Sequence, residues 1–270
     1  MIALLRLTFI HVMRSRLLIA LLIFTFVVQL LGVRLLHSMT LVWQGIISSL
    51  DFRDVLFVAL LFQLGSGGFL AAAYGLWIAP YLHRGHREQL TFCLPVGKWI
   101  FPVAHASMLF GLALLQHVIL MISFAVNFGW GVFLKSDFPW AGTVSGFFLE
   151  LIAFEFAMFA FGVGALVLGV IPSLFLGVVS VFVLQGLAAV VRFKLDRYFL
   201  PWGGDGDTWL GVLNRWAPPF GELAYDLRKI FVKPVADWSV FGLWAIWLLV
   251  AMGGFWFLVT RPRLSRSSDA

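Results

Sequence analysis

The chain alternates between long apolar stretches and shorter polar ones. Six of the stretches each hold about the 20 apolar residues that a helix needs to cross the hydrocarbon core of a membrane. They are residues 17–36, 55–79, 100–126, 141–168, 172–191 and 240–259. Only three residues separate the fourth stretch from the fifth, and Pro172 suits the first turn of a new helix because its missing N–H would be unpaired there. The pattern predicts an all-α, polytopic membrane protein with six transmembrane helices.

Two segments outside these stretches have the spacing of amphipathic helices. In residues 1–16 apolar positions recur at helical spacing while Arg6 and Arg14 lie elsewhere on the wheel, so we expect a helix along the membrane surface. Residues 192–239 contain two short candidates, one starting after Asp207, whose side chain can cap a helix, and one over residues 221–231. We expect both at the outer membrane surface, before the sixth span.

The composition agrees with a lipid environment. The 270-residue chain is 61% hydrophobic and 12% charged, with a mean hydropathy of +0.98. An ordinary soluble domain is about 45–50% apolar and about 25% charged. So few polar residues cannot form a water-facing exterior, which excludes soluble and fibrous classes. We expect the whole chain, 1–270, to form a single transmembrane domain.

The distribution of basic residues predicts the orientation. Six spans put both termini on one side, with nine Lys and Arg there and ten on the other side. Seven of those ten lie in the long 192–239 segment, where the positive-inside rule is weaker. We therefore expect both termini and residues 80–98 in the cytoplasm. The net charge of +6 is assigned to this rule and not to nucleic acid, since no basic face with interleaved aromatics occurs outside the spans.

Residues 80–98, between the second and third spans, are longer than a simple turn requires. Their charged or titratable side chains are His83, Arg84, His86, Arg87, Glu88 and Lys98. Apolar positions such as Leu90 lie among them, and Pro95 ends any helix because it disfavours helical geometry in the preceding residue. Such a two-sided element can dock in a groove of another protein. The alternative is a solvated loop that only satisfies the positive-inside rule.

This segment resembles the polar segment between the second and third spans of the ABC-2 type permeases, the membrane subunits of ATP-binding-cassette exporters. Gly85 lies at the family glycine's distance before Pro95, and the residues from Pro95 to Lys98 resemble the family's Pro-Val-x-Arg/Lys ending. Leu90 and Leu94 fall on its apolar positions. The chain departs from the family where it has basic residues in place of acids and lacks the Thr-Leu after the glycine.

The resemblance extends to six spans, cytoplasmic termini, a tight inner turn between spans four and five, and a long outer segment before span six. It implies that the 83–98 segment is a coupling helix that docks in a cleft of a separate ATPase subunit. The residues carried over to that role are His83, Arg84, Gly85, His86, Arg87, Glu88, Leu90, Pro95 and Lys98. It also implies a dimeric permease core, as a homodimer or a heterodimer, in a bacterial inner membrane.

The chain has no phosphate-binding GxxxxGK[ST] loop. We therefore expect ATP and Mg on the partner ATPase dimer, no cofactor in this chain, and no enzyme activity of its own. The expected function is to move an amphipathic or hydrophobic substrate outward, driven by that ATPase. An intramembrane enzyme is disfavoured because no Ser/His, His/Glu or Asp/Asp constellation matches one.

Two acidic residues, Glu150 and Glu155, fall within the fourth span. An ionised acid there costs several kcal/mol and by default faces the bundle interior and marks a pathway. Five residues apart, they lie about 140° apart on a helical wheel and cannot share one face. This geometry disfavours a paired-carboxylate catalytic site, but a proton-coupled secondary transporter or channel that uses these residues stays open as the alternative function.

The remaining candidates favour structural roles. His83 and His86 could ligate one metal jointly, but no third ligand lies nearby, and His105 and His117 are more than three turns apart. We therefore expect no metal site. Cys93 is the single cysteine, which excludes an intrachain disulfide. Glycines within the second and fourth spans suit close helix packing: Gly65, Gly67, Gly68, Gly162 and Gly164.

Overall fold

The computed structural model describes residues 14–43, 52–83, 99–135, 138–193, 208–232 and 238–260, together with residues 6, 9, 10 and 12. Its six long helices are α2 (Arg16–Trp43), α3 (Phe52–His83), α5 (Ile100–Phe128), α6 (Trp140–Leu168), α7 (Val170–Arg192) and α11 (Trp238–Thr260). All six are long and apolar enough to cross a membrane, and the described residues contain no strand. The predicted all-α class and six spanning helices are confirmed.

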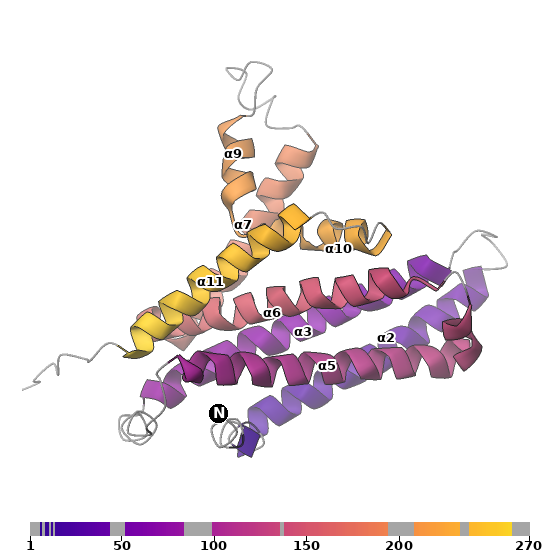
Figure 1. Cartoon of the computed structure of the whole chain (residues 1–270), viewed down its shortest axis with the longest axis horizontal. Helices are drawn as coiled ribbons and strands as arrows, with labels where there is room; N and C mark the ends of the chain where they lie inside the picture. Colours follow the sequence, from indigo (N-terminus) through magenta and orange to yellow (C-terminus); the bar gives the residue numbers. More distant parts are fainter. Residues whose placement is uncertain are drawn as a thin grey trace, which may run out of the picture.

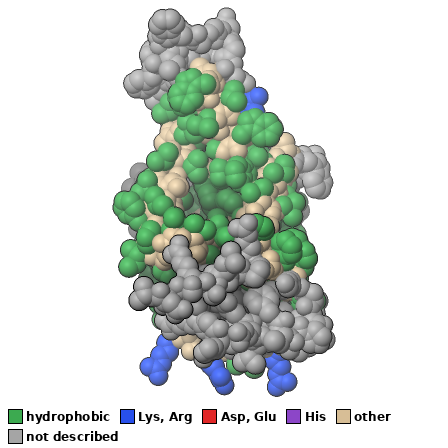
Figure 2. All heavy atoms as spheres, turned by 90° about the vertical axis from the view of Figure 1, so that its left-hand side faces the viewer, with side chains coloured by type: hydrophobic (Ala, Val, Ile, Leu, Met, Phe, Trp, Pro, Cys, Tyr) green, Lys and Arg blue, Asp and Glu red, His purple; other side chains and the backbone are tan. Residues whose placement is uncertain are grey.

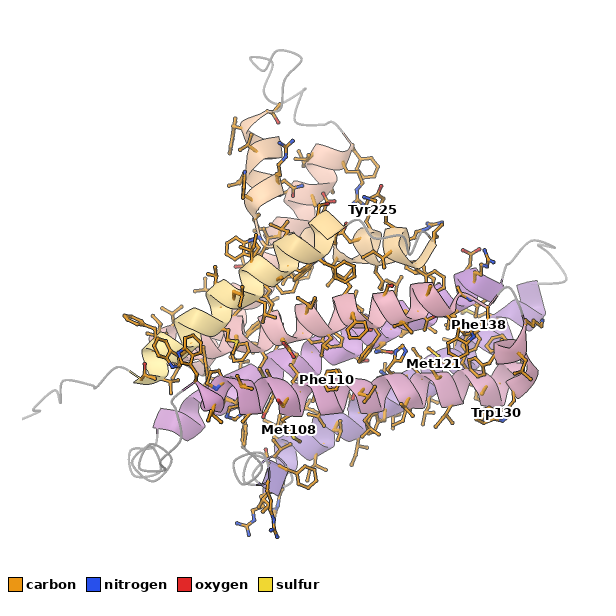
Figure 3. All side chains as sticks on the ribbon, viewed as in Figure 1. Met108, Phe110, Met121, Trp130, Phe138 and Tyr225 are labelled. Carbon is orange, nitrogen blue, oxygen red and sulfur yellow. The ribbon has the colours of Figure 1, made fainter. Side chains whose placement is uncertain are left out.

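Four of the helices form an elongated bundle. Figure 1 shows α2, α3, α5 and α6 running side by side, with α11 crossing α6 obliquely. The left-hand end of that view holds the start of α2, the end of α3, the start of α5, the α6–α7 turn and the end of α11. At the opposite end, the short helix η1 (Trp130–Leu134) connects α5 to α6, and Figure 3 shows Trp130 and Phe138 together there.

The core is centred on α6, which packs against α3, α5, α7, α11 and the short helix α10 (Leu223–Val232). Its fully buried side chains include Leu149 and Phe159, and the adjacent α3 buries Leu56, Leu60 and Tyr74. The exterior is different: on the face drawn in Figure 2, hydrophobic side chains cover most of the described part, with Lys and Arg near its ends. A hydrophobic exterior around a packed core is what a lipid-embedded bundle requires.

A single glycine makes the turn between α6 and α7. Gly169 has φ 90° and ψ 168°, and its N–H donates to the carbonyl oxygen of Ala165 over 3.1 Å, which closes α6. The next helix starts at Val170, so Pro172 lies within its first turn, where a missing N–H leaves no carbonyl unpaired. The predicted split of the long apolar stretch into two helices is therefore correct.

The segment before α11 contains α9 (Trp209–Trp216), η2 (Pro219–Gly221) and α10 (Leu223–Val232). The cap of α9 is Thr208, whose hydroxyl accepts a hydrogen bond from the N–H of Gly211 over 3.1 Å. The prediction that Asp207 is the cap is wrong by one residue, since the oxygen must reach the N–H of the third helical residue. The apolar side of α10, which includes Leu227 and Phe231, is buried.

Two predicted elements fall largely outside the described residues. The 84–98 part of the proposed coupling element is not described, and His83 is the last residue of α3. In the N-terminal segment the described residues other than Ser15 are helical, with Arg6 and Arg14 exposed and Val12 buried. That arrangement suits an amphipathic helix, but the full 1–16 helix stays a prediction.

Candidate functional site: polar side chains buried in the bundle

Several polar side chains are buried inside the helix bundle. Their positions on the four bundled helices are Thr25 and Gln29 on α2, Gln63 and Ser66 on α3, His105, Gln116 and Ser123 on α5, and Thr143 and Glu150 on α6. In a membrane such groups are expensive unless they find hydrogen-bond partners, and they mark either helix contacts or a transport path. Their hydrogen bonds therefore indicate what each can do.

Two hydrogen bonds join α3 to α5. Nδ1 of His117 lies 3.1 Å from Oε1 of Gln63, to which it donates, and the Tyr74 hydroxyl lies 2.9 Å from Nδ1 of His105. The pairs occur in opposite order along the two helices, as antiparallel neighbours require. Each histidine thus has its own partner on α3, at two separate levels of the bundle.

A third hydrogen bond joins α5 to α2. Nε2 of Gln116 donates to the hydroxyl oxygen of Thr25 over 2.8 Å. Gln116 also approaches α3 closely, because a Cβ added to Gly67 would lie 3.1 Å from its Oε1. The Gln116 carboxamide therefore sits where α2, α3 and α5 meet. We call Thr25, Gln29, Gln63, Gln116 and His117 the polar seam.

The polar seam contains more polar atoms than its hydrogen bonds use. Among the described residues, Nε2 of Gln63 and both amide atoms of Gln29 are buried without a hydrogen-bond partner. Gln29 lies one turn after Thr25 on α2 and is fully buried. Unsatisfied buried amides are costly, so the seam has spare donors and acceptors for a polar ligand or for bound water.

Glu150, on α6, is fully buried. Among the described residues, neither of its carboxyl oxygens has a hydrogen-bond partner. One turn earlier, a Cβ at Gly146 would lie 3.1 Å from Leu227 of α10 and 3.9 Å from Leu60 of α3. On the same face, the Phe147 ring lies 4.8 Å from the ring of His117, and Phe154 packs on Gly67 of α3. Glu150 therefore lies on the side of α6 that covers α3, next to the polar seam.

Glu155 is only partly buried, whereas Glu150 is fully buried. Their five-residue spacing keeps them on different sides of α6. The structure therefore leaves two isolated carboxyl groups and no acidic pair. No group of three or more His, Cys, Asp or Glu side chains able to hold a metal ion occurs in the described part of the chain.

Close helix contacts depend on some of the predicted glycines and on others that sequence reasoning missed. A Cβ at Gly67 would overlap the Phe154 ring, whereas one at Gly65 would meet nothing within 4 Å. Sequence reasoning did not single out Gly75, whose Cβ would overlap the carbonyl oxygen of Met158, or Gly142, which packs equally closely on Phe231. Spacing within a span does not reveal which glycine faces a neighbouring backbone.

Sequence reasoning also did not single out the glutamines of the polar seam. Gln29, Gln63 and Gln116 interrupt apolar spans, and a polar side chain in a span is itself a signal. Only the packing shows that Gln63 and Gln116 engage partners on other helices. Of the predicted coupling residues the structure describes only His83, at the end of α3, where the chain enters the 84–98 segment.

Comparisons of the chain with protein-family models, with curated proteins and with solved structures find no match.

Proposed function

We propose that this chain is the membrane-spanning permease subunit of an ATP-binding-cassette exporter of the ABC-2 type. In this proposal it dimerises in a bacterial inner membrane with both termini in the cytoplasm. Two separate ATPase subunits bind ATP and Mg, dock on residues 83–98 and drive an amphipathic or hydrophobic substrate outward. The chain itself contributes no catalytic residue and holds no cofactor.

The observation that carries the proposal is the way α3 and α5 are tied together. These two helices flank the 84–98 segment, and the pairs Gln63–His117 and Tyr74–His105 link them at two levels. A force applied to the segment would thus move both helices together. Because α3 also packs along α6, the force would continue into the core as a rigid-body movement.

The topology gives further support. One end of the bundle holds the start of α2, the ends of the helices that flank the segment, the α6–α7 turn and the end of α11. The ABC-2 arrangement requires these to lie on one side. The long segment before α11 contains short helices, as that arrangement also has. The motif ending Pro95-Val96-Gly97-Lys98 connects this topology to the family.

Co-purification tests the docking role. In cells that produce both the chain and the ATPase partner that the proposal requires, an affinity tag on the chain would recover the complex. Charge reversal by Arg84→Glu, Arg87→Glu and Glu88→Arg should lose the ATPase, because the docking surface changes sign. The matched control, Arg261→Glu with Arg263→Glu, changes basic residues on the same expected side but outside the segment, and should retain it.

Two results would refute the docking role. One is recovery of the ATPase in equal amounts with the reversed variant and with the unaltered chain. The other is the absence of any phosphate-binding-loop ATPase from the purified complex. A folding defect is recognised separately, because a misfolded variant elutes as an aggregate in size-exclusion chromatography.

A second candidate, a proton-coupled transporter or channel, is favoured by one specific observation. The carboxyl of Glu150 is fully buried and has no hydrogen-bond partner among the described residues, which is typical of a proton-carrying acid in a membrane protein. In this alternative, vesicles containing the purified chain alone would take up protons without ATP.

A pH-sensitive dye inside such vesicles separates the two functions. The alternative requires proton uptake that Glu150→Gln and Glu155→Gln abolish, while the control Glu222→Gln, which changes an acid outside the spans, leaves it intact. The exporter proposal expects no ATP-independent uptake with any of these chains. Uptake that stops only in the Glu150 and Glu155 variants would favour the transporter and count against the exporter.

A further inference from the structure

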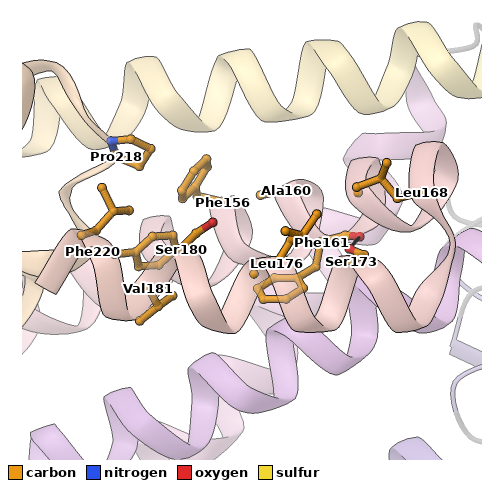
Figure 4. Close-up of a pocket in the computed structure, with 13 residues that line it drawn as sticks. Phe156, Ala160, Phe161, Leu168, Ser173, Leu176, Ser180, Val181, Pro218 and Phe220 are labelled. Atoms are coloured by element: carbon orange, nitrogen blue, oxygen red, sulfur yellow. Dashed lines mark hydrogen bonds between the residues drawn. The ribbon is translucent and has the colours of Figure 1, made fainter. Parts of the chain in front are cut away.

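A cavity of about 240 Å³ lies between α6, α7 and the turn that contains η2. Figure 4 shows Pro218 and Phe220 at one end of it and Leu168 and Ser173 at the other. Apart from the η2 turn, its lining comes from the membrane-spanning parts of α6 and α7. The two helices that supply most of the lining are thus long and apolar enough to cross the hydrocarbon of a membrane.

The cavity lies along the face of α7 that packs on α6 and on the η2 turn, between close contacts made at small residues. Near the start of α7, Gly164 packs on Ser173, and Gly177 packs on the ring of Phe161. Farther along, Gly221 packs against the backbone at Leu184. Small residues permit each contact, and the side chains between them do not fill the space that remains.

The lining suits hydrocarbon better than water. Its only hydroxyl groups belong to Ser173 and Ser180, and the Ser173 hydroxyl donates to the carbonyl oxygen of Phe161 over 3.3 Å. A buried water needs about 2–4 polar partners, and cavities that lack them stay dry and accept apolar guests. Aromatic side chains, Phe156 and Phe220 among them, supply much of the remaining surface.

The lipid around α7 is an apolar ligand that suits this lining. Within the 18-residue apolar stretch of each helix, only 6% of the α7 residues are buried, against 50% of the α6 residues. Phe175 and Phe182 are each 68% exposed, so α7 contacts lipid along its outer faces. Pockets for drug-sized ligands measure about 300–1,000 Å³, so this smaller cavity favours a slender chain over a ring system.

We propose that this cavity binds the acyl chain of a membrane lipid, which enters from the bilayer beside α7. The chain packs against Phe156, Phe161 and Phe220, between α6, α7 and the η2 turn. The proposal needs only that α6 and α7 span a membrane. It does not rest on the exporter function, and it stands or falls separately from the co-purification experiment above.

Photolabelling tests the proposal directly. The purified full-length chain would be placed in phosphatidylcholine vesicles in which one acyl chain carries a diazirine, irradiated, and mapped by peptide mass spectrometry. Labelling at cavity residues is expressed relative to labelling at Phe175 and Phe182, which face lipid in every variant. We expect strong labelling of Phe161, Phe220 and Ser180 in the unaltered chain.

Two variants fill the cavity, and one control does not. Ala160→Phe and Ser180→Leu add bulk to its lining, so both should lower the labelling ratio severalfold. Val183→Phe adds an aromatic ring at a position that is 62% exposed and outside the lining, so it should leave the ratio unchanged. A ratio that neither filling variant lowers would overturn the proposal.

A second copy of the chain is the other conceivable occupant. In a chain carrying Cys93→Ser, the variant Ser180→Cys would then form disulfide-linked dimers under mild oxidation, and lipid labelling of the cavity would be absent. That result would also overturn the proposal. An acyl-chain site instead predicts a monomeric Ser180→Cys product together with the labelling described above.

Discussion

At the scale of single residues, two features hold the bundle together: glycines where backbones touch, and glutamine and histidine side chains that cross between helices. Gly75 lies where the backbone of α3 meets that of α6 at Met158. Gln116 reaches from α5 to Thr25 on α2. Membrane helices lack a hydrophobic drive to associate, so they depend on such close packing and on interhelical hydrogen bonds.

Gly75→Ala should destabilise the chain strongly. The added Cβ would overlap the Met158 carbonyl oxygen, so the two helix backbones must move apart. Overpacking of this kind costs about 1–3 kcal/mol and occasionally more. The measurement is the thermal unfolding midpoint in detergent. The control Gly111→Ala adds a Cβ on α5 that meets nothing within 4 Å, and should leave the midpoint equal or higher. Equal midpoints for both variants would contradict the predicted contact.

The Gln116–Thr25 hydrogen bond should show a measurable coupling energy. A double-mutant cycle with Gln116→Leu and Thr25→Val, read from the free energy of unfolding, should give about 0.6 kcal/mol, the average for interhelical bonds in a membrane protein. A parallel cycle with Thr25→Val and Tyr74→Phe joins residues of different hydrogen bonds and should be additive. Additivity in the first cycle would show that the bond contributes nothing.

At the scale of elements, hydropathy predicted every spanning helix but underestimated several lengths. The first span was expected to end at Leu36, yet α2 continues to Trp43, and the second was expected over residues 55–79, yet α3 covers Phe52–His83. The physical reason is that a helix satisfies its own backbone and continues past the hydrocarbon into the interface. The α6–α7 hairpin was predicted from Pro172, but Gly169 makes the turn.

Gly169→Ala should therefore weaken the hairpin. A residue with φ 90° and ψ 168° occupies a region that is essentially restricted to glycine, and a side chain there costs about 1–3 kcal/mol. We expect a lower thermal unfolding midpoint than for Gly186→Ala, a control within α7 whose Cβ would meet nothing within 4 Å. If both alanine variants unfold at the same temperature, the turn does not have the described conformation.

At the scale of the whole molecule, the arrangement brings the helix ends that flank the 84–98 segment to the same end as the start of α2 and the end of α11. Each span carries the chain to the opposite end, so an even number of spans returns it to the end where it started. The side of the membrane, however, rests on the distribution of basic residues. The orientation is therefore an expectation that experiment can check independently of the proposed function.

Reporter fusions check the orientation. Green fluorescent protein fused after Thr260 should be fluorescent, because we expect that end in the cytoplasm. Alkaline phosphatase inserted within residues 194–207 should be active, because we expect that segment outside. A phosphatase fused within residues 84–98 serves as the internal control and should be inactive. An active phosphatase there, combined with a dark C-terminal fusion, would mean that the chain has the opposite orientation.

The sequence alone determined the class of the protein and the number of its spans, because a membrane requires each crossing helix to be apolar over its own length. It also identified Glu150 and Glu155 and placed them on different faces, since helical geometry is local. Only the tertiary structure decided which polar groups meet, that Glu150 is enclosed, and that α6, α7 and the η2 turn line a cavity. Those features depend on the rotation and tilt of each helix against its neighbours, which distant residues set together.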